Sequence, residues 1–529
     1  MGELPRLIWM LVDGLPFWLL DRFRRADALP PTLARLFDEG GITELAPIWP
    51  NCQTPPSLFT LFSGLPPTVH GLSGFDLPDR RDPLAKHNGF NGFPRDIPMV
   101  WDRYASAGQT IRLCQVPFVD AAGMGSHLLS ASYGFGAPAL APRLIEGLAI
   151  GRQEIWPEIG VTCVIAQLTP AAVTLRLEPT GDRVTIARDG WEPIGLPDGL
   201  STLAGLVWRD GEPVLIVLGA WREARAGCRP APDFAKTPFV GGGVADLFRR
   251  GAFGRIAIDG GDGTAERAFV GAIRAIGRRY WVEAIHAQAS ADADFILAYQ
   301  PAYDLLFHEL LGLIDRSSRF HRPEIAALAE SLILTALGDL DAGLAALLAG
   351  ESGERLFLAS DHGMKPVDTV LLPNAVLAQL GLAATDRAAI DPARSVAFFH
   401  PAETGLVCMH ADRLQAHGLT PADVMDRLVD AFTEAAPCPA DWFAIDLPEV
   451  GPAGYINRYY LSPGSGQTMK ADIGPQPTRR ARKSADHATT SHDPQLRGVV
   501  AALAGGAAMR LPRTIEAADV LPVMMGPAR

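Results

Sequence analysis

Three short apolar segments of this chain each end shortly before an acidic residue. Residues 7–12 precede Asp13, residues 295–299 precede Asp304, and residues 355–359 precede Asp361. Continuous apolar runs of this length are typical of strands that are buried on both faces in a parallel sheet. Sites in open α/β sheets form beyond the carboxyl ends of such strands. We therefore expect the three carboxylates to meet at one edge of one sheet.

Strand and helix patterns alternate along much of the chain. Residues 31–39 and 98–107 have helical apolar spacing, and residues 42–47 and 110–115 are strand-like. This alternation predicts an α/β fold with a doubly wound, mostly parallel central sheet flanked by helices.

Two segments depart from this alternation. Residues 155–225 contain strand-like runs separated by Asp-Gly turns, which predicts an antiparallel β-rich insertion. Residues 386–460 have a mixed α/β pattern, and residues 462–486 are rich in Gly, Pro and Arg, which predicts a loop. The predicted core comprises residues 1–125, 265–385 and 485–529.

Histidines accompany the carboxylates. His308 follows Asp304 by four residues, which places both side chains on one face of a helix. His362 directly follows Asp361, so their side chains diverge and can reach one metal from two directions. His487 lies far along the chain, with His492 as the alternative. Such oxygen and nitrogen donors suit Zn²⁺, with Mn²⁺ or Fe as alternatives, and we expect two divalent metal ions.

Thr54 stands directly before a predicted helix over residues 55–63. Backbone N–H groups at a helix N-terminus favour an anion. A threonine hydroxyl is a weak nucleophile at neutral pH, and a metal can activate it. An activated hydroxyl beside two metals predicts hydrolysis of a phosphate or related ester, with Thr54 as the catalytic residue.

The composition of the chain limits the classes of molecule that it is expected to bind. A net charge of −12 argues against a general binder of nucleic acid or of anionic membranes. We expect a small phosphorylated substrate, because metals can supply local positive charge. The six cysteines form no C-x-x-C pair, no signal-peptide cleavage site follows residues 7–12, and we find no apolar run of membrane-helix length. We therefore expect a cytoplasmic protein, whose oligomeric state the sequence does not indicate.

The motifs resemble those of the alkaline phosphatase superfamily, and within it the type I phosphodiesterase/nucleotide pyrophosphatase family. The shared motifs are Val12-Asp13-Gly14, Thr54-Pro55-Pro56-Ser57 with Ser63-Gly64 and His70-Gly71 behind it, Tyr299 through Asp304 to His308, and Ser360-Asp361-His362-Gly363-Met364. The resemblance implies an alkaline-phosphatase-like fold over the predicted core.

The resemblance also implies a role for each residue. Asp13, Thr54, Asp361 and His362 would hold one metal, and Thr54 would carry the phosphoryl intermediate. Asp304, His308 and a late histidine would hold the other metal, which activates water. His487 stands at the family's distance from the closing strand near residue 499, whereas His492 is too close to it.

Two positions differ from the family and leave the substrate open. Ala488 follows the late histidine in place of glycine, and the phosphate-contacting asparagine is absent from residues 72–76. The main prediction is a phosphodiesterase or nucleotide pyrophosphatase-like enzyme. Alternatives are a phosphomonoesterase or phosphonate-type hydrolase on the same site, or an inactive metal-binding protein. A sulfatase is disfavoured because it would need Pro or Ala and then Arg after its cysteine, whereas Gln53-Thr54-Pro55 follows Cys52. A metal-dependent phosphoglycerate mutase is disfavoured because its nucleophile would be a serine.

Overall fold

A computed structural model gives the structure of most of the chain. It describes residues 6–119, 133–134, 140–157, 160–178, 180–196, 200–222, 237–238, 243–289, 293–349, 355–387, 389–436, 440–448, 450–505 and 507–525. The predicted boundaries at residues 125 and 225 lie outside these ranges, as do Cys228 and Cys438. The other cysteines, Cys52, Cys114, Cys163 and Cys408, are free and buried.

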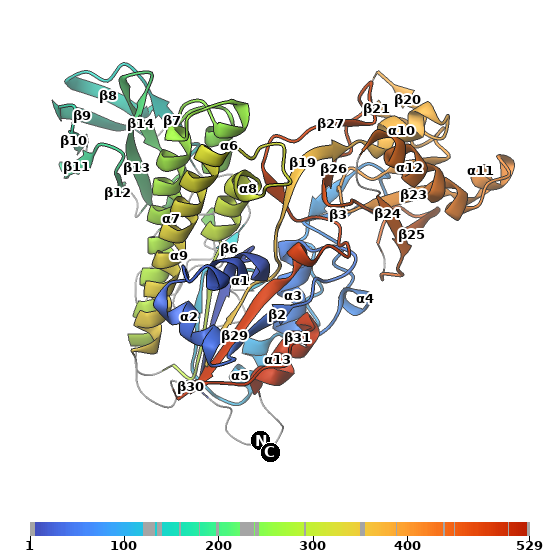
Figure 1. The fold of residues 1–529 in the computed structure, drawn as a ribbon, viewed down its shortest axis with the longest axis horizontal. Coiled ribbons are helices and arrows are strands. Elements are labelled where there is room, and N and C mark those ends of the chain that lie inside the picture. Colours follow the sequence, from blue (N-terminus) through green and yellow to red (C-terminus); the bar gives the residue numbers. More distant parts are fainter. Residues whose placement is uncertain are drawn as a thin grey trace.

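A mixed, mostly parallel sheet forms the centre of the molecule (Figure 1). Its order is β31 (Thr514–Ile515), β2 (Ile42–Leu45), β29 (Gly498–Ala504), β18 (Arg355–Ala359), β1 (Leu7–Val12), β17 (Phe295–Gln300) and β5 (Ile111–Cys114). β30 (Ala507–Ala508) pairs with β29. Only β29 runs against both of its neighbours in that order. The predicted fold class is confirmed.

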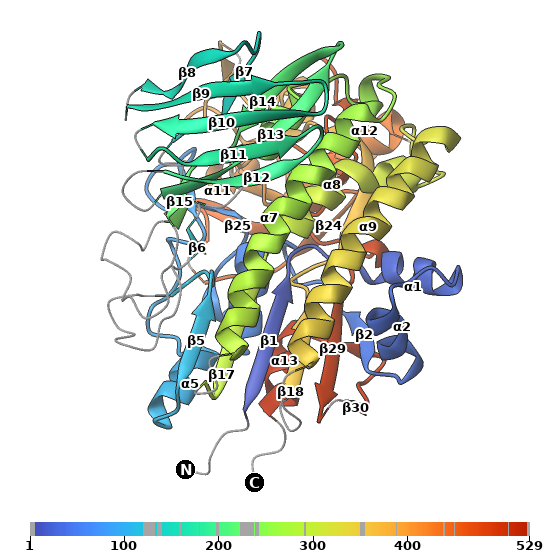
Figure 2. The ribbon, with the colours of Figure 1, turned by 90° about the vertical axis from the view of Figure 1, so that its left-hand side faces the viewer.

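The alternation of side chains along β1 divides the core into two layers. Ile8, Met10 and Val12 face a cluster with α1 (Phe17–Arg25), α2 (Pro31–Asp38), α7 (Thr264–Ala289), α8 (Ala302–Ile314) and α9 (Pro323–Leu348). Leu7, Trp9 and Leu11 face a cluster with α3 (Thr54–Ser63), α5 (Val100–Ser106) and α13 (Ala517–Met525). Because a strand points successive side chains to opposite faces, β1 is buried on both sides. Figure 2 shows α7 and α9 side by side across one face.

Helix α9 corrects the expectation that the chain has no apolar run of membrane-helix length. By length and composition alone it could cross a membrane, with a mean hydropathy of 1.6 over its most apolar window. Its side chains Ile333, Leu337 and Leu340 are instead packed in the same core as α7 and α8. A core helix of this length passes the same test, so α9 is weak evidence for a membrane span.

Residues 143–222 contain two antiparallel sheets, drawn in teal and green in Figure 2. The first is β8 (Gly151–Trp156), β9 (Val161–Leu168), β10 (Ala172–Glu178) and β11 (Arg183–Ala187). The second is β7 (Arg143–Ile145), β12 (Trp191–Gly195), β13 (Leu200–Arg209), β14 (Glu212–Val217) and β15 (Trp221–Arg222). Asp189 and Asp210 adopt positive φ at the turns that their Asp-Gly pairs predicted.

A second group of elements outside the central sheet follows α10 (Pro373–Gln379) and is orange in Figure 1. We call these elements, residues 397–462, the second subordinate layer. Its antiparallel sheet contains β22 (Ala397–Phe399), β23 (Leu406–His410), β25 (Tyr455–Ser462) and β24 (Asp441–Ala444). Helices α11 (Ala411–Ala416) and α12 (Pro421–Ala435) accompany it. This matches a mixed α/β pattern, while the exact domain limits stay a prediction.

The predicted loop over residues 462–486 is wrong. It contains β26 (Gly466–Met469), β27 (Thr478–Arg480) and β28 (Ala485–Asp486), which all pair with β19 (Lys365–Leu371). These strands are short and are separated by Gly- and Pro-rich turns, so local propensity does not indicate them. Their pairing partner lies about a hundred residues earlier in the chain, and tertiary contact decides the structure.

Candidate metal centre

The three strands that precede the acidic residues are adjacent in the sheet. β1 pairs in parallel with β17 on one side and with β18 on the other. Asp13 directly follows β1, Asp361 follows β18, and Asp304 lies in the first turn of α8 after β17. Because parallel neighbours end at the same edge, the carboxylates meet there.

Asp13, Asp361 and His362 form one group of possible metal ligands. His362 Nε2 lies 3.4 Å from Asp13 Oδ1 and 3.2 Å from Asp361 Oδ2. The Tyr299 hydroxyl donates to Asp13 Oδ2, and the Gly14 N–H donates to Asp361 Oδ1 at 3.0 Å. Each carboxylate is thus held through one oxygen while the other oxygen faces the imidazole.

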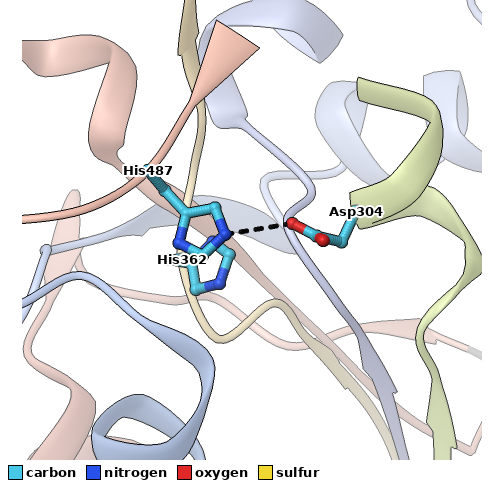
Figure 3. A group of neighbouring side chains, drawn as sticks. All are labelled: Asp304, His362 and His487. Atoms are coloured by element: carbon cyan, nitrogen blue, oxygen red, sulfur yellow. Dashed lines mark ion pairs between the residues drawn. The ribbon is translucent and has the colours of Figure 1, made fainter. Parts of the chain in front are cut away.

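Asp304, His362 and His487 form a second group (Figure 3). His487 Nε2 lies 3.2 Å from Asp304 Oδ1, and the rings of His362 and His487 stack with centroids 3.7 Å apart. His308 Nε2 lies 3.4 Å from the other oxygen, Asp304 Oδ2. His362 therefore belongs to both groups, and all six predicted ligand side chains are brought together.

The structure separates the two late histidines. His487 lies in the second ligand group, whereas His492 packs against Trp49 with ring centroids 5.4 Å apart. Trp49 in turn contacts Phe443 of β24. Among the described residues, His492 is therefore part of an aromatic contact and of neither ligand group.

A backbone carbonyl faces the Nδ1 atom of each site histidine. His308 Nδ1 lies 2.8 Å from Ala485 O, His362 Nδ1 lies 3.0 Å from Gly363 O, and His487 Nδ1 lies 2.7 Å from Cys52 O. A carbonyl oxygen only accepts, so each Nδ1 carries a proton and each Nε2 is the nitrogen that remains to bind a metal. This is the tautomer that a metal-binding imidazole requires.

Burial and neighbouring charges shift the pKa values of the site residues. Burial and the carboxylates of Asp361 and Asp304 raise the pKa of Asp13 well above its usual range. Burial opposes ionisation of Asp304, but the His308 and His487 imidazoles outweigh it and lower the pKa of that carboxyl. Burial lowers the pKa of His308 to about 3. Positive charge placed among these groups would relieve the repulsion.

Three buried carboxylate oxygens of the site lack a hydrogen-bond partner. They are Asp13 Oδ1, Asp304 Oδ1 and Asp361 Oδ2. An unpaired buried charge is costly. The same oxygens are the ones that face the imidazole Nε2 atoms. Carboxylate oxygens without another partner and imidazole Nε2 atoms thus converge at one place, and this donor set fits divalent metal ions.

Thr54 begins α3 beside the first ligand group. Its Oγ1 atom lies 3.3 Å from His362 Nε2, and the residue is 5% exposed. Pro55 and Pro56 carry no N–H, and the Ser57 N–H donates to Gln53 O at 3.1 Å. Of the first four helical residues, Thr54 alone therefore retains a backbone N–H for an anion, fewer donors than a usual helix N-terminus.

Comparison with known families and structures identifies the fold. Residues 7–147 match the family model described as type I phosphodiesterase / nucleotide pyrophosphatase. Phosphonoacetate hydrolase from Sinorhizobium meliloti 1021, solved with phosphonoformate, superposes with a TM-score of 0.50 at 13% identity, over 99% of this chain and 96% of that one. The fold of this chain is therefore similar to the fold of that hydrolase.

Two further solved structures are similar at lower scores. The alkaline phosphatase PafA has a TM-score of 0.47 at 12% identity, covering 99% of this chain and 96% of that one. Human ectonucleotide pyrophosphatase/phosphodiesterase 5 has a TM-score of 0.41 at 11% identity, covering 98% and 93%. No curated protein matches the chain. The resemblance inferred from the motifs to the alkaline phosphatase superfamily, and to the phosphodiesterase family over residues 7–147, is confirmed.

Sequence reasoning on the superfamily motifs missed Asp486. This buried carboxylate accepts from Thr468 Oγ1 at 2.5 Å and from Lys483, and it lies 3.9 Å from His308 Nδ1. Its neighbours Lys483 and His308 keep its pKa below the usual range despite burial. Lys483 lies three residues earlier in the chain, but the other partners of Asp486 come from β26 and α8, so little in the local sequence marks this carboxylate.

Proposed function

We propose that this protein is a metal-dependent hydrolase of phosphate esters that uses Thr54 as its nucleophile. The observation that supports it most is the placement of the Thr54 hydroxyl 3.3 Å from His362 Nε2, beside carboxylate oxygens that lack partners. The match of residues 7–147 to the phosphodiesterase family supports the same reaction class.

The proposed metal set is divided between the two ligand groups. Asp13, Thr54, Asp361 and His362 would hold one divalent ion, and Asp304, His308 and His487 would hold the other. Zn²⁺ suits these donors best. When bound, the two ions supply positive charge that activates the hydroxyl and the water and neutralises the phosphoryl oxygens.

The side chains of this chain then act in two steps. The Thr54 N–H at the start of α3 can bind a phosphoryl oxygen, which places phosphorus next to Oγ1. Oγ1 attacks phosphorus as the bond to the leaving-group oxygen breaks, and the proton lost from Oγ1 passes through solvent to that oxygen, which leaves as an alcohol. In the second step water attacks the phospho-threonine, which releases phosphate or a phosphate monoester and restores the hydroxyl.

Substitution of Thr54 tests this proposal. Thr54→Ala removes the nucleophile, so we expect kcat/KM on a chromogenic phosphodiester and on its monoester to fall by about three orders of magnitude or more. Zinc content should change little, because six other ligand side chains remain. Ser57→Ala removes another buried hydroxyl from the same helix and serves as the control.

The intermediate gives a second readout. Acid quenching of the wild type during turnover should yield a phosphorylated peptide that contains Thr54, and this peptide should be absent from Thr54→Ala. Undiminished hydrolysis by Thr54→Ala would refute the nucleophile assignment. A wild type that binds zinc but hydrolyses neither ester would instead support the inactive metal-binding alternative.

A further inference from the structure

Lysines are rare in this chain, and two of them lie beside the candidate metal centre. Among 47 basic residues, the lysines are Lys86, Lys236, Lys365, Lys470 and Lys483. Lys470 and Lys483 line a cavity of about 220 Å³ that His308 and His487 also line. The cavity therefore opens directly beside the second ligand group.

Lys483 reaches this cavity from the segment between β27 and β28. Its ammonium pairs with the buried Asp486, which neutralises that carboxylate. An ammonium has three donors, so a second acceptor can bind to the same group. Arg479, Arg480 and Arg482 precede it, which makes this the most basic short run at the site.

Lys470 is held on the cavity wall by Glu403. Glu403 accepts from the Lys470 ammonium and, at 3.1 Å, from the Ala471 N–H. It does so from a backbone with φ of 56°, a conformation that residues other than glycine rarely adopt. Glu403 thus binds the turn between β22 and β23 to the residues that follow β26, and it holds Lys470 at the cavity wall.

Residues beside the nucleophile form another part of the cavity wall. Gln53 directly precedes Thr54, and its side-chain oxygen accepts from the Phe75 N–H at 2.6 Å. Both residues line the same cavity as the two lysines. A leaving group attached to a phosphoryl group at Thr54 would therefore extend past Phe75 toward the ammonium groups.

We propose that this cavity binds a second anionic group, a carboxylate or a phosphate, on the leaving-group part of the substrate. Lys483 and Lys470 donate to it. The alternative, a cationic leaving group, would face two ammonium groups. The three carboxylates among the described residues of the lining, Asp76, Glu403 and Asp486, are already paired with Lys86, Lys470 and Lys483. The inference rests on the proposed function and adds a substrate class to it.

The test uses the zinc-loaded full chain and three aryl phosphates. They differ in one meta substituent, which is a carboxylate, a phosphate or a neutral carboxamide. For the wild type we expect kcat/KM to be at least about tenfold higher for one anionic substrate than for the carboxamide, as a charge-assisted hydrogen bond would give. The substituent with the higher kcat/KM, carboxylate or phosphate, is the anionic group that the cavity prefers.

Lysine variants locate the effect. Lys483→Met should lower the anion-to-carboxamide ratio about tenfold, Lys483→Arg should restore most of it, and Lys470→Met should lower it independently. Arg479→Met removes a charge from the same run but from a pair with Asp472 outside the cavity lining, and it should leave the ratio unchanged. The ratio corrects for any general loss of activity.

The outcomes separate the two proposals. Hydrolysis of all three substrates with equal kcat/KM, or a ratio that neither lysine variant changes, overturns this inference and leaves the proposed function intact. An equal fall in Arg479→Met and Lys483→Met also overturns it, because long-range charge would then explain the preference. Absence of hydrolysis of all three substrates, offered both as monoesters and as methyl diesters, overturns the proposed function, and the inference with it.

Discussion

The residue types of the site were predictable, but their orientation was not. Acidic residues after buried strands, and histidines at helical or adjacent spacing, indicated the ligands of both groups. The carbonyls that orient the histidines belong to Cys52, Gly363 and Ala485. Two of them lie more than a hundred residues from the histidine they contact, so no local pattern could reveal them.

His400 gives a pH prediction at the residue scale. Burial, with a smaller contribution from Lys86, lowers its pKa from the ordinary 6.5 to about 4. The unfolded chain therefore binds this proton more readily between pH 6.5 and pH 4, and stability falls as pH drops through that window. The expected loss is about 3 kcal/mol.

Denaturant unfolding across that pH range measures this effect. His400→Asn keeps an acceptor near the Ala402 N–H that His400 Nδ1 binds, and it removes the titration. We expect a flatter dependence of unfolding free energy on pH in the variant than in the wild type. His417 is an exposed histidine, so His417→Asn is the control and should leave the slope unchanged. Equal slopes in His400→Asn and the wild type would contradict the prediction.

At the scale of elements, the sequence located the core strands and helices and misjudged the segment that carries His487. Buried strands and amphipathic helices have strong periodic signals, and the helix predicted over residues 31–39 is α2, Pro31–Asp38. β28 has no periodic signal in the sequence, because it is held by pairing with Lys365 and Pro366 and by contact with α8. The Ser484 N–H donates to His308 O at 3.0 Å, which ties the two histidine-bearing elements together.

Gly312 of α8 tests this tie. A Cβ atom at this position would overlap the Ser484 carbonyl, so Gly312→Ala must push β28 away from α8. We expect a loss of about 1–3 kcal/mol in unfolding free energy, as overpacking costs. Zinc affinity should also fall, because His487 moves with β28. Isothermal titration with zinc and urea unfolding measure the two effects.

Gly338 in α9 is the matched control. Nothing lies within 4 Å of a Cβ built there. Gly338→Ala should therefore stabilise the protein by about 0.5–1 kcal/mol through helix propensity, with zinc affinity unchanged. If Gly312→Ala bound zinc like the wild type, β28 would not depend on this close contact.

At the scale of the whole molecule, the site lies where the central sheet meets the second subordinate layer. Its ligands follow β1, β17, β18 and β28, and the cavity beside it is completed by Glu403 of the second subordinate layer. The sequence predicted both antiparallel and mixed segments outside the core, and their limits stay a prediction. The position of the second subordinate layer beside the site could not be predicted, because it depends on contacts such as Asn51 Nδ2 to Thr404 O at 2.8 Å.

Metal removal should therefore weaken the whole fold. A ligand that binds only the folded state stabilises it by about 4 kcal/mol at a thousandfold excess over Kd. We expect a chelator to lower Tm and added zinc to restore it. Asp304→Asn, which removes one ligand charge, should show a smaller zinc-dependent shift. A Tm that does not respond to zinc in the wild type would contradict a metal site here.

The position of β29 in the sheet has a consequence for synthesis. This strand lies between β2 and β18, although about 450 residues separate it from the first of them in the chain. During translation β2 and β18 must wait, unjoined, until β29 has been synthesised. His487 emerges from the ribosome only shortly before β29, so a nascent chain acquires its final ligand and its closing strand almost together.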